Sequence, residues 1–393
     1  MDFQARLSAL GIDPDEASDA PLDIRVSVKS LRELRDIIGV QGDIDTRRAR
    51  FDAIFADTPN FQDEQLRAAE EFVFGLADDM ALAEQSAGPT FPLDIYLQAA
   101  KSIDVDGELD LTTTNGELHK VVYGTVTIKA GGYIVAEATP LDFTCDKLIL
   151  EGDPPAGKGH FNILGKTGAA HGAISKPGTP GQASTGHVAV CGSGKPGGIG
   201  EVATNGTNGG NGARGNDGIP SQFANIDITT SLSVTGTTKL LVATQSGAGG
   251  AGQNGGPGGD AGKGGNGGKG DGCGCGTALD GGPGQKGGIG GKGGRAGDGG
   301  NGVDAAANIV LSVPNADFAK VQQTAIATQA PPGKAGDRGA AGGKGGGGTG
   351  GAEGGKGSHK GPDGGYGGDG EIGDPGVDGT VSGKPAQYTP QPK

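Results

Sequence analysis

The chain has 393 residues, of which 85 are glycine and 16 are aromatic, with no tryptophan, and its net charge is −14. Glycine at this level is about three times the usual ~7%. A chain so poor in large apolar side chains cannot bury a core in proportion to its length, which excludes a large conventional enzyme fold over the whole chain. The negative charge also disfavours nucleic acid and anionic bilayers as partners.

Targeting signals are missing from the sequence. No run of 18 apolar residues predicts a membrane span, and residues 1–20 lack the basic and apolar regions of a secretory signal. The four cysteines form no disulfide framework. We therefore expect a protein that works inside a cell or leaves it without a cleaved signal, with a virion or cell surface favoured over the cytoplasm.

Residues 1–90 predict an acidic helical domain. Ser30 precedes LRELRDIIG, Asp43 or Asp45 can cap TRRARFDAIFA, and Asn60 can begin a longer helix that runs to about Gln85. The apolar stripes of these helices have two interpretations. They form the domain's own core, or they dock to a larger assembly or to like subunits.

Residues 91–150 change to an alternation of apolar and polar residues, typical of short strands. Glycine pairs and an Asn-Gly pair separate the segments. This β-rich neck is predicted to be a small sandwich or the rungs of a solenoid.

Residues 151–393 alternate strand blocks with glycine arrays. Val242–Gln245 resembles residues 326–329, and Lys147–Leu150 resembles residues 239–242, which indicates a degenerate repeat of 84–92 residues. The strand blocks cover 222–245 and 305–329, and the arrays cover 206–218, 249–270, 281–302 and 333–379.

The arrays keep a period of three, mostly as Gly-Gly-X, which predicts an extended helix with three residues per turn and no internal hydrogen bonds. Its backbone groups need outside partners, so two assemblies are possible. A collagen-like trimer is disfavoured because proline is 16 of 243 residues after position 150, well below the collagen level. An intramolecular bundle with X pointing outward fits better.

With this Gly-Gly-X period of three, the arrays resemble the polyglycine-II sandwich class, including the glycine-rich tips of tail-fibre adhesins of T-even-type phages. The resemblance covers about 206–379. It implies stacked polyglycine helices and, for the phage proteins, host-receptor binding by the loops between them. The predicted fold class is therefore mixed: an N-terminal α-helical domain, a short β-rich neck, and a polyglycine-II helix bundle with interspersed strands.

Motifs for catalysis or cofactors are weak. GGPGGD at 255–260 and GGYGGD at 364–369 begin like the calcium nonapeptide, but Gly262 and Glu371 replace its large apolar residue. Cys273 and Cys275 lack two further metal ligands nearby. The five histidines are scattered, so we expect no enzyme, no cofactor and no metal.

The expected function is a structural or adhesive one, as a recognition tip on a virion or cell surface that binds a surface receptor. Candidate contact loops are 171–205 and 271–280. A filament or matrix subunit and a collagen-like stalk are the alternatives, and an ice-binding protein is disfavoured by the charged X residues. The candidate binding residues are Leu279, Asp280, His359 and Tyr366.

Overall fold

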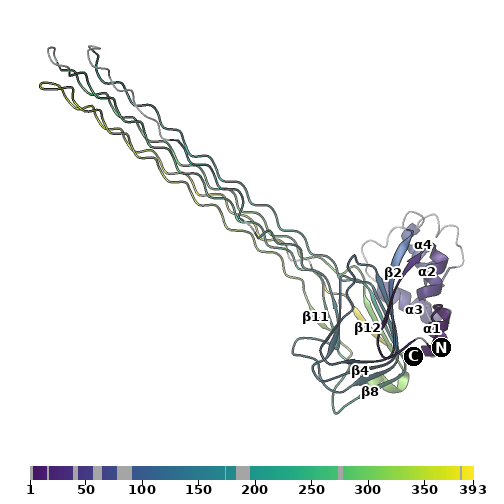
Figure 1. Ribbon diagram of the computed structural model, residues 1–393. Helices are drawn as coiled ribbons and strands as arrows, with labels where there is room; N and C mark the ends of the chain where they lie inside the picture. Colours follow the sequence, from purple (N-terminus) through teal and green to yellow (C-terminus); the bar gives the residue numbers. More distant parts are fainter. Residues whose placement is uncertain are drawn as a thin grey trace.

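The computed structural model describes residues 3–15, 17–38, 43–55, 64–77, 91–172, 174–182, 195–272, 278–380 and 383–393. A base of sheets and helices carries a long bundle of glycine-rich segments that projects to one side (Figure 1). Both termini lie at the base, on the side of the helices.

Two sheets form the base, and successive coils of the chain contribute a strand to each. The larger sheet has the order β1-β2-β4-β6-β8-β10-β12, and the smaller has the order β11-β9-β7-β5-β3. All pairs are parallel except β1 with β2. The larger sheet comprises β1 (Leu22–Val28), β2 (Leu93–Val105), β4 (Leu118–Ile128), β6 (Leu141–Leu150), β8 (Ala224–Val234), β10 (Ile309–Val313) and β12 (Tyr388–Pro392). The smaller comprises β3 (Glu108–Asp110), β5 (Tyr133–Glu137), β7 (Phe161–Leu164), β9 (Val242–Gln245) and β11 (Ile326–Thr328).

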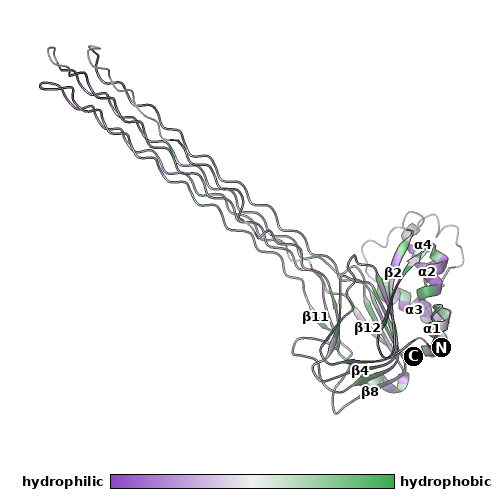
Figure 2. Cartoon of the chain, viewed as in Figure 1, coloured by the Kyte–Doolittle hydropathy of each residue, from purple (hydrophilic) through white to green (hydrophobic). Residues whose placement is uncertain are grey.

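The main core lies between the two sheets. Alternate residues of each strand point into it, because side chains in a strand alternate between its two faces. Tyr123, Phe143 and Phe161 are fully buried there and meet edge to face, with ring centroids 5.8 and 5.1 Å apart. Figure 2 shows that apolar residues are concentrated in the base.

Helices cover the outer face of the larger sheet. They are α1 (Phe3–Ala9), α2 (Leu31–Ile38), α3 (Ile44–Phe55) and α4 (Glu64–Val73), and a 3-10 helix follows β10 at Asn315–Lys320. Phe51 of α3 packs with Phe74 and with Val310 of β10. Leu7 of α1 packs with Leu97 of β2. The amphipathic helices therefore complete their apolar contacts on the sheet.

The predicted fold class is wrong. Residues 1–90 are no separate helical domain, because β1 lies inside this region and extends the larger sheet. The strands of residues 91–150 do not form a separate neck, because they share both sheets with β8 to β11, which lie in the predicted strand blocks 222–245 and 305–329, and with β12. Periodicity within each segment could not show that the helical stripes face a sheet formed by distant residues. Of the helix predicted between Asn60 and Gln85, residues 64–73 form α4, and residues 78–90 lie outside the described residues.

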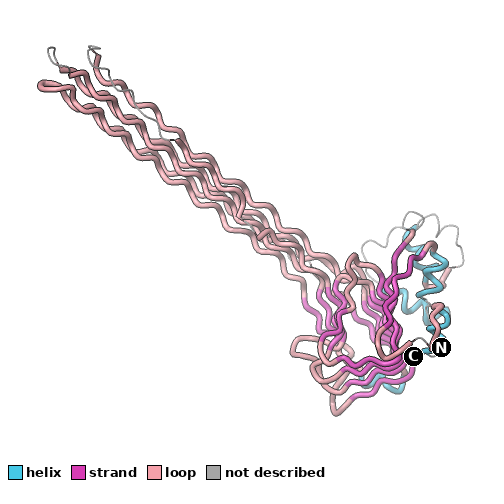
Figure 3. The backbone as a smooth tube through the Cα atoms, viewed as in Figure 1, coloured by secondary structure: helices cyan, strands magenta, loops and turns pink. Residues whose placement is uncertain are grey.

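The resemblance to the polyglycine-II sandwich of phage tail-fibre tips is likewise corrected. The chain has a mixed α/β fold built on a seven-stranded mixed sheet and a parallel sheet. The glycine-rich residues are insertions into the coils of this fold. They leave it as three hairpins, at 165–223 between β7 and β8, at 246–308 between β9 and β10, and at 329–387 between β11 and β12 (Figure 3).

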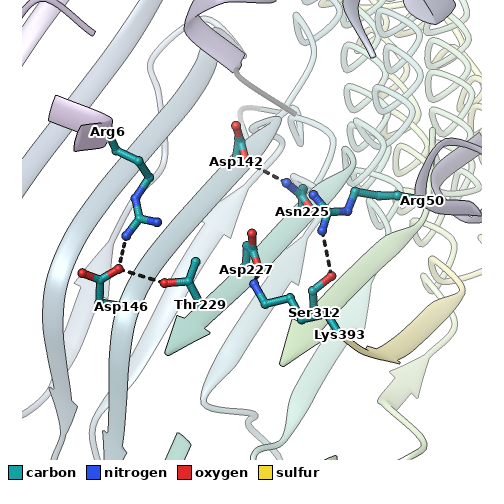
Figure 4. A network of polar contacts seen from close by, with 9 residues as sticks. All are labelled: Arg6, Arg50, Asp142, Asp146, Asn225, Asp227, Thr229, Ser312 and Lys393. Carbon is teal, nitrogen blue, oxygen red and sulfur yellow. Dashed lines mark hydrogen bonds and ion pairs between the residues drawn. The ribbon is translucent and has the colours of Figure 1, made fainter. Parts of the chain in front are cut away.

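Charged side chains are buried between the helices and the larger sheet (Figure 4). Asp142 of β6 accepts hydrogen bonds from Lys120 Nζ (2.5 Å) and Asn225 Nδ2 (2.8 Å). Asp146 pairs with Arg6 of α1 and accepts a bond from Thr229 Oγ1 at 2.8 Å. Four further residues extend the network: Lys393 pairs with Asp227, and Arg50 of α3 donates to Ser312 Oγ of β10 at 3.1 Å. The network thus ties helices α1 and α3 and the last strand to the central strands.

We expect Asp142→Ala to lower the free energy of unfolding by about 3–5 kcal/mol, because it leaves the buried Lys120 ammonium without its carboxylate. Both side chains are less than a tenth exposed. Urea unfolding followed by circular dichroism measures the change. The control is Asp94→Ala, which removes an exposed partner of Arg25 and should cost less than about 1 kcal/mol. Equal losses in the two variants would contradict this account of the network.

Candidate recognition surface

The three hairpins together form a rod of six extended arms. Arms 1, 3 and 5 leave the base and arms 2, 4 and 6 return to it (Figure 1). At ~3.1 Å per residue, arm 3 spans about 80 Å. The arms are arm 1 (166–182), arm 2 (195–219), arm 3 (247–272), arm 4 (278–303), arm 5 (331–354) and arm 6 (358–380).

Backbone hydrogen bonds join neighbouring arms at every third residue. In arm 3, Gly256 donates to Gly210 of arm 2 and Gly258 donates to Ala340 of arm 5, both at 2.8 Å. In arm 4, Gly291 donates to Gly259 of arm 3, also at 2.8 Å. The complete pattern places arms 1, 3 and 5 in one row and arms 2, 4 and 6 in a second row, with arms 3 and 4 central.

Glycine is required inside the rod because the backbones approach too closely for a Cβ. A Cβ on Gly294 would lie 1.8 Å from the carbonyl oxygen of Gly210. A Cβ on Gly365, on the outer surface of arm 6, would meet no atom within 4 Å. The two positions have the same residue type in the same rod and differ in the space around them.

Gly294→Ala should therefore destabilise the rod by about 1–3 kcal/mol, the usual cost of overpacking. The matched variant Gly365→Ala should leave its stability unchanged. Hydrogen exchange at the amides of arms 2 and 4 measures the effect, since local opening of the rod need not unfold the base. Protection that is the same in both variants would show that the arms are not packed backbone to backbone.

Side chains at the third triplet position form a second set of contacts, which we call latches. In a latch, an Asn or Asp oxygen of one arm accepts the hydrogen bond of a backbone N–H that faces outward on the next arm. Asn208 accepts from Lys292 N at 2.9 Å, and Asp260 accepts from Gly343 N at 2.7 Å. Further latches between neighbouring arms of one row pair Asn205 with Ile289, Asn211 with Arg295, Asp217 with Asn301, Asn254 with Asp337, Asn266 with Thr349, Asp298 with Val377 and Asn301 with Thr380.

Two of the sequence-predicted binding residues form such a latch near the far end of the rod. Asp280 Oδ1 accepts a hydrogen bond from His359 N at 2.6 Å and lies 3.3 Å from His359 Nδ1. Leu279 is half-buried and donates its N–H to Asp271 O, whereas Tyr366 is 72% exposed on arm 6. The structure brings Asp280 and His359 together and leaves Tyr366 apart from them. Their role in binding stays a prediction.

The predicted contact loops are largely arms. Residues 171–172, 174–182 and 195–205 belong to arms 1 and 2, and residues 271–272 and 278–280 belong to arms 3 and 4. The remaining residues of both loops, including Cys273 and Cys275, lie outside the described residues.

The latches lower the pKa of their carboxyl groups. For Asp217, Asp280 and Asp298 the main cause is the hydrogen bond from the backbone N–H of the next arm, which favours the charged form. These carboxylates therefore hold the arms together most strongly when ionised.

The rod should lose stability in acid. Because the folded pKa values lie below the ordinary Asp value of 3.8, the stabilisation is complete above that value and is lost as the pH falls through the lowered values. Asp217→Asn with Asp298→Asn keeps an acceptor oxygen and removes the titration. Hydrogen exchange of arms 4 and 6 between pH 6 and pH 2.5 should show a smaller acid effect in this variant. If the acid effect on hydrogen exchange is the same in this variant as in the native protein, these two carboxylates are not its cause.

An apolar strip lies on the row of arms 2, 4 and 6, toward the far end. Ile199 and Val202 of arm 2 and Ile289 of arm 4 are 58, 74 and 50% exposed. Pro283 and Pro362 occupy the same row, and Gly200 N donates to Pro283 O while Gly284 N donates to Pro362 O. In the sequence, Pro283 and Ile289 are two apolar residues at X positions that are otherwise mostly polar. Their alignment with arm 2 needed the register between arms.

Outside this surface, the described ranges contain no group of three or more His, Cys, Asp or Glu side chains that could hold a metal ion. No helix within the same ranges is long and apolar enough to cross a membrane. No family model, curated protein or solved structure matches the chain.

Proposed function

We propose that this protein is a non-enzymatic recognition protein in which the base anchors a rod and the far part of the rod contacts a target on a surface. The observation that supports this most directly is the rod itself. Its arms join through backbone bonds and latches, so they form a stiff spacer that holds the exposed apolar strip far from the base.

The distribution of charge supports a division between base and rod. The three hairpins (166–219, 247–303 and 331–380) carry 14 basic and 13 acidic side chains, whereas the whole chain has a net charge of −14. The acidic excess therefore belongs to the base. A near-neutral rod can approach acidic or basic surfaces alike, and the acidic base suits a basic docking surface on a larger assembly. A virion or cell surface is the setting we propose.

The apolar strip is the part of the rod best suited to contact. Ile199, Val202 and Ile289 bury little of their apolar surface within the chain, and grouped exposed apolar residues commonly mark interaction sites. Lys286 lies between Pro283 and Ile289 on the same arm and is exposed, so it adds a positive charge to an otherwise apolar surface. Nearer the base, the same row is charged, for example at Lys292 and its ion-pair partner Asp374.

Binding to a panel of intact bacterial cells and to an immobilised glycan array tests this function. The variant Ile199→Asn with Val202→Asn and Ile289→Asn should lower binding at least tenfold, because it removes the apolar contacts but leaves the glycine backbone unchanged. The control is Ile174→Asn, an equally exposed isoleucine on arm 1 in the other row. Absence of binding by the native protein, or equal binding by both variants, would count against the proposal.

A further inference from the structure

One backbone position links each arm to the next arm in its row. It is the residue that follows the outward-facing residue of a triplet, and we call it the linking position. Gly178 of arm 1 donates to Pro257 of arm 3, and Gly258 of arm 3 donates to Ala340 of arm 5. In the other row, Gly209 of arm 2 donates to Lys292 of arm 4, and Gly293 of arm 4 donates to Glu371 of arm 6.

In arms 3 and 4 the linking position is glycine at every triplet except Ala261 and Ala296. A Cβ on Gly249 of arm 3 would lie 2.6 Å from Gly333 N of arm 5, and a Cβ on Gly290 of arm 4 would lie 2.8 Å from Gly370 N of arm 6. A larger side chain at this position thus prevents the close approach of a further arm.

Arms 5 and 6 break this rule. Most of their linking positions carry large or charged side chains, which the inner arms exclude, and two carry alanine, which the inner arms also hold at 261 and 296. In arm 5 they are Ala335, Arg338, Ala341, Lys344 and Glu353, with glycine at 347 and 350, and in arm 6 they are Lys360, Asp363, Tyr366, Asp369, Ile372, Pro375 and Asp378.

Three aspartates of arm 6 also occupy the N–H groups that a further arm would need. Asp363 accepts from Gly350 N at 2.7 Å, Asp378 from Ala335 N at 2.8 Å, and Asp369 from Lys344 N at 3.2 Å. All three donors lie at linking positions of arm 5. Pro375 has no N–H to offer.

We propose that arms 5 and 6 form a terminal edge that is closed against a second copy of this chain. A second copy is the relevant occupant, because its arms would continue the bonding that already joins the second hairpin to the third. Side chains at the linking positions keep such an arm at a distance, and the aspartates satisfy donors that it would otherwise accept. The protein is then a monomeric rod, and the filament subunit of the sequence-based alternatives is disfavoured.

The larger sheet of the base also ends in an edge strand, β12, that is protected from further pairing. β12 is the outermost strand of the larger sheet, and Pro390 and Pro392 within it pair with Leu311 and Val313 of β10. Proline on an edge strand lacks the N–H that another strand would use. The sheet and the rod therefore both end in a segment whose residues hinder bonding to a further strand or arm.

A glycine variant of the edge tests the proposal by sedimentation velocity. It replaces Arg338, Lys344, Asp363, Tyr366, Asp369, Ile372 and Asp378 with glycine and should associate as its concentration rises. The matched control replaces the same seven residues with asparagine, which also removes the charges but keeps a side chain at each linking position. The native protein and the asparagine variant should both remain monomeric.

Circular dichroism establishes that each variant is folded. A folded glycine variant that stays monomeric overturns the proposal, as does an asparagine variant that associates as strongly. Sedimentation velocity of the native protein also tests the proposal, without any glycine variant. If it associates and Tyr366→Asp with Ile372→Asp abolishes the association, the edge is open. If it is monomeric at every concentration, the edge is closed.

Discussion

The structure depends on one spacing, the distance between hydrogen-bonded strands in the parallel sheets. Neighbouring strands lie about 4.8 Å apart, and each of the last three coils of the base delivers one hairpin, after β7, β9 and β11. The hairpins therefore leave the base already stacked. Arms with side chains on all faces could not continue at that spacing. Glycine at two of three positions lets the backbones bond to one another along the rod, as Gly256 bonds to Gly210.

Ordering so much glycine is entropically unfavourable, by roughly 0.5–1 kcal/mol per residue relative to alanine. Two features offset this cost. The base supplies a conventional core, in which Tyr123, Phe143 and Phe161 are fully buried and hold the coils together. The latches then satisfy outward-facing donors, as Asn208 does for Lys292. Polar residues along the rod thus have a structural role in addition to keeping it soluble.

Some of the fold could be predicted from local patterns. The helix at Leu31–Ile38 and the strands between residues 93 and 150 follow their periodicities. The repeat that relates Val242–Gln245 to residues 326–329 identified strands that are neighbours, β9 and β11, although Ala243 pairs with Ile326. The repeat that relates Lys147–Leu150 to residues 239–242 was misleading, since Lys147 lies in the larger sheet and Val242 in the smaller. Similar strand sequences arise in both sheets because both face the same core.

The candidate surface was harder to predict from the sequence than the strands and helices were. Asp280 was selected as part of the predicted contact loop 271–280, and His359 because it lies within a glycine array. They meet in a latch, but a contact 79 residues apart in sequence depends on the register of arms 4 and 6. The sequence by itself determined the triplet phase and the polar side chains at most X positions, because both are properties of the order of residues along the chain. Only the tertiary structure decided that the helices cover a sheet, which donors the latches satisfy, and that Ile199 and Ile289 share one surface. Those features need distant segments to be set at one spacing, which no local pattern records.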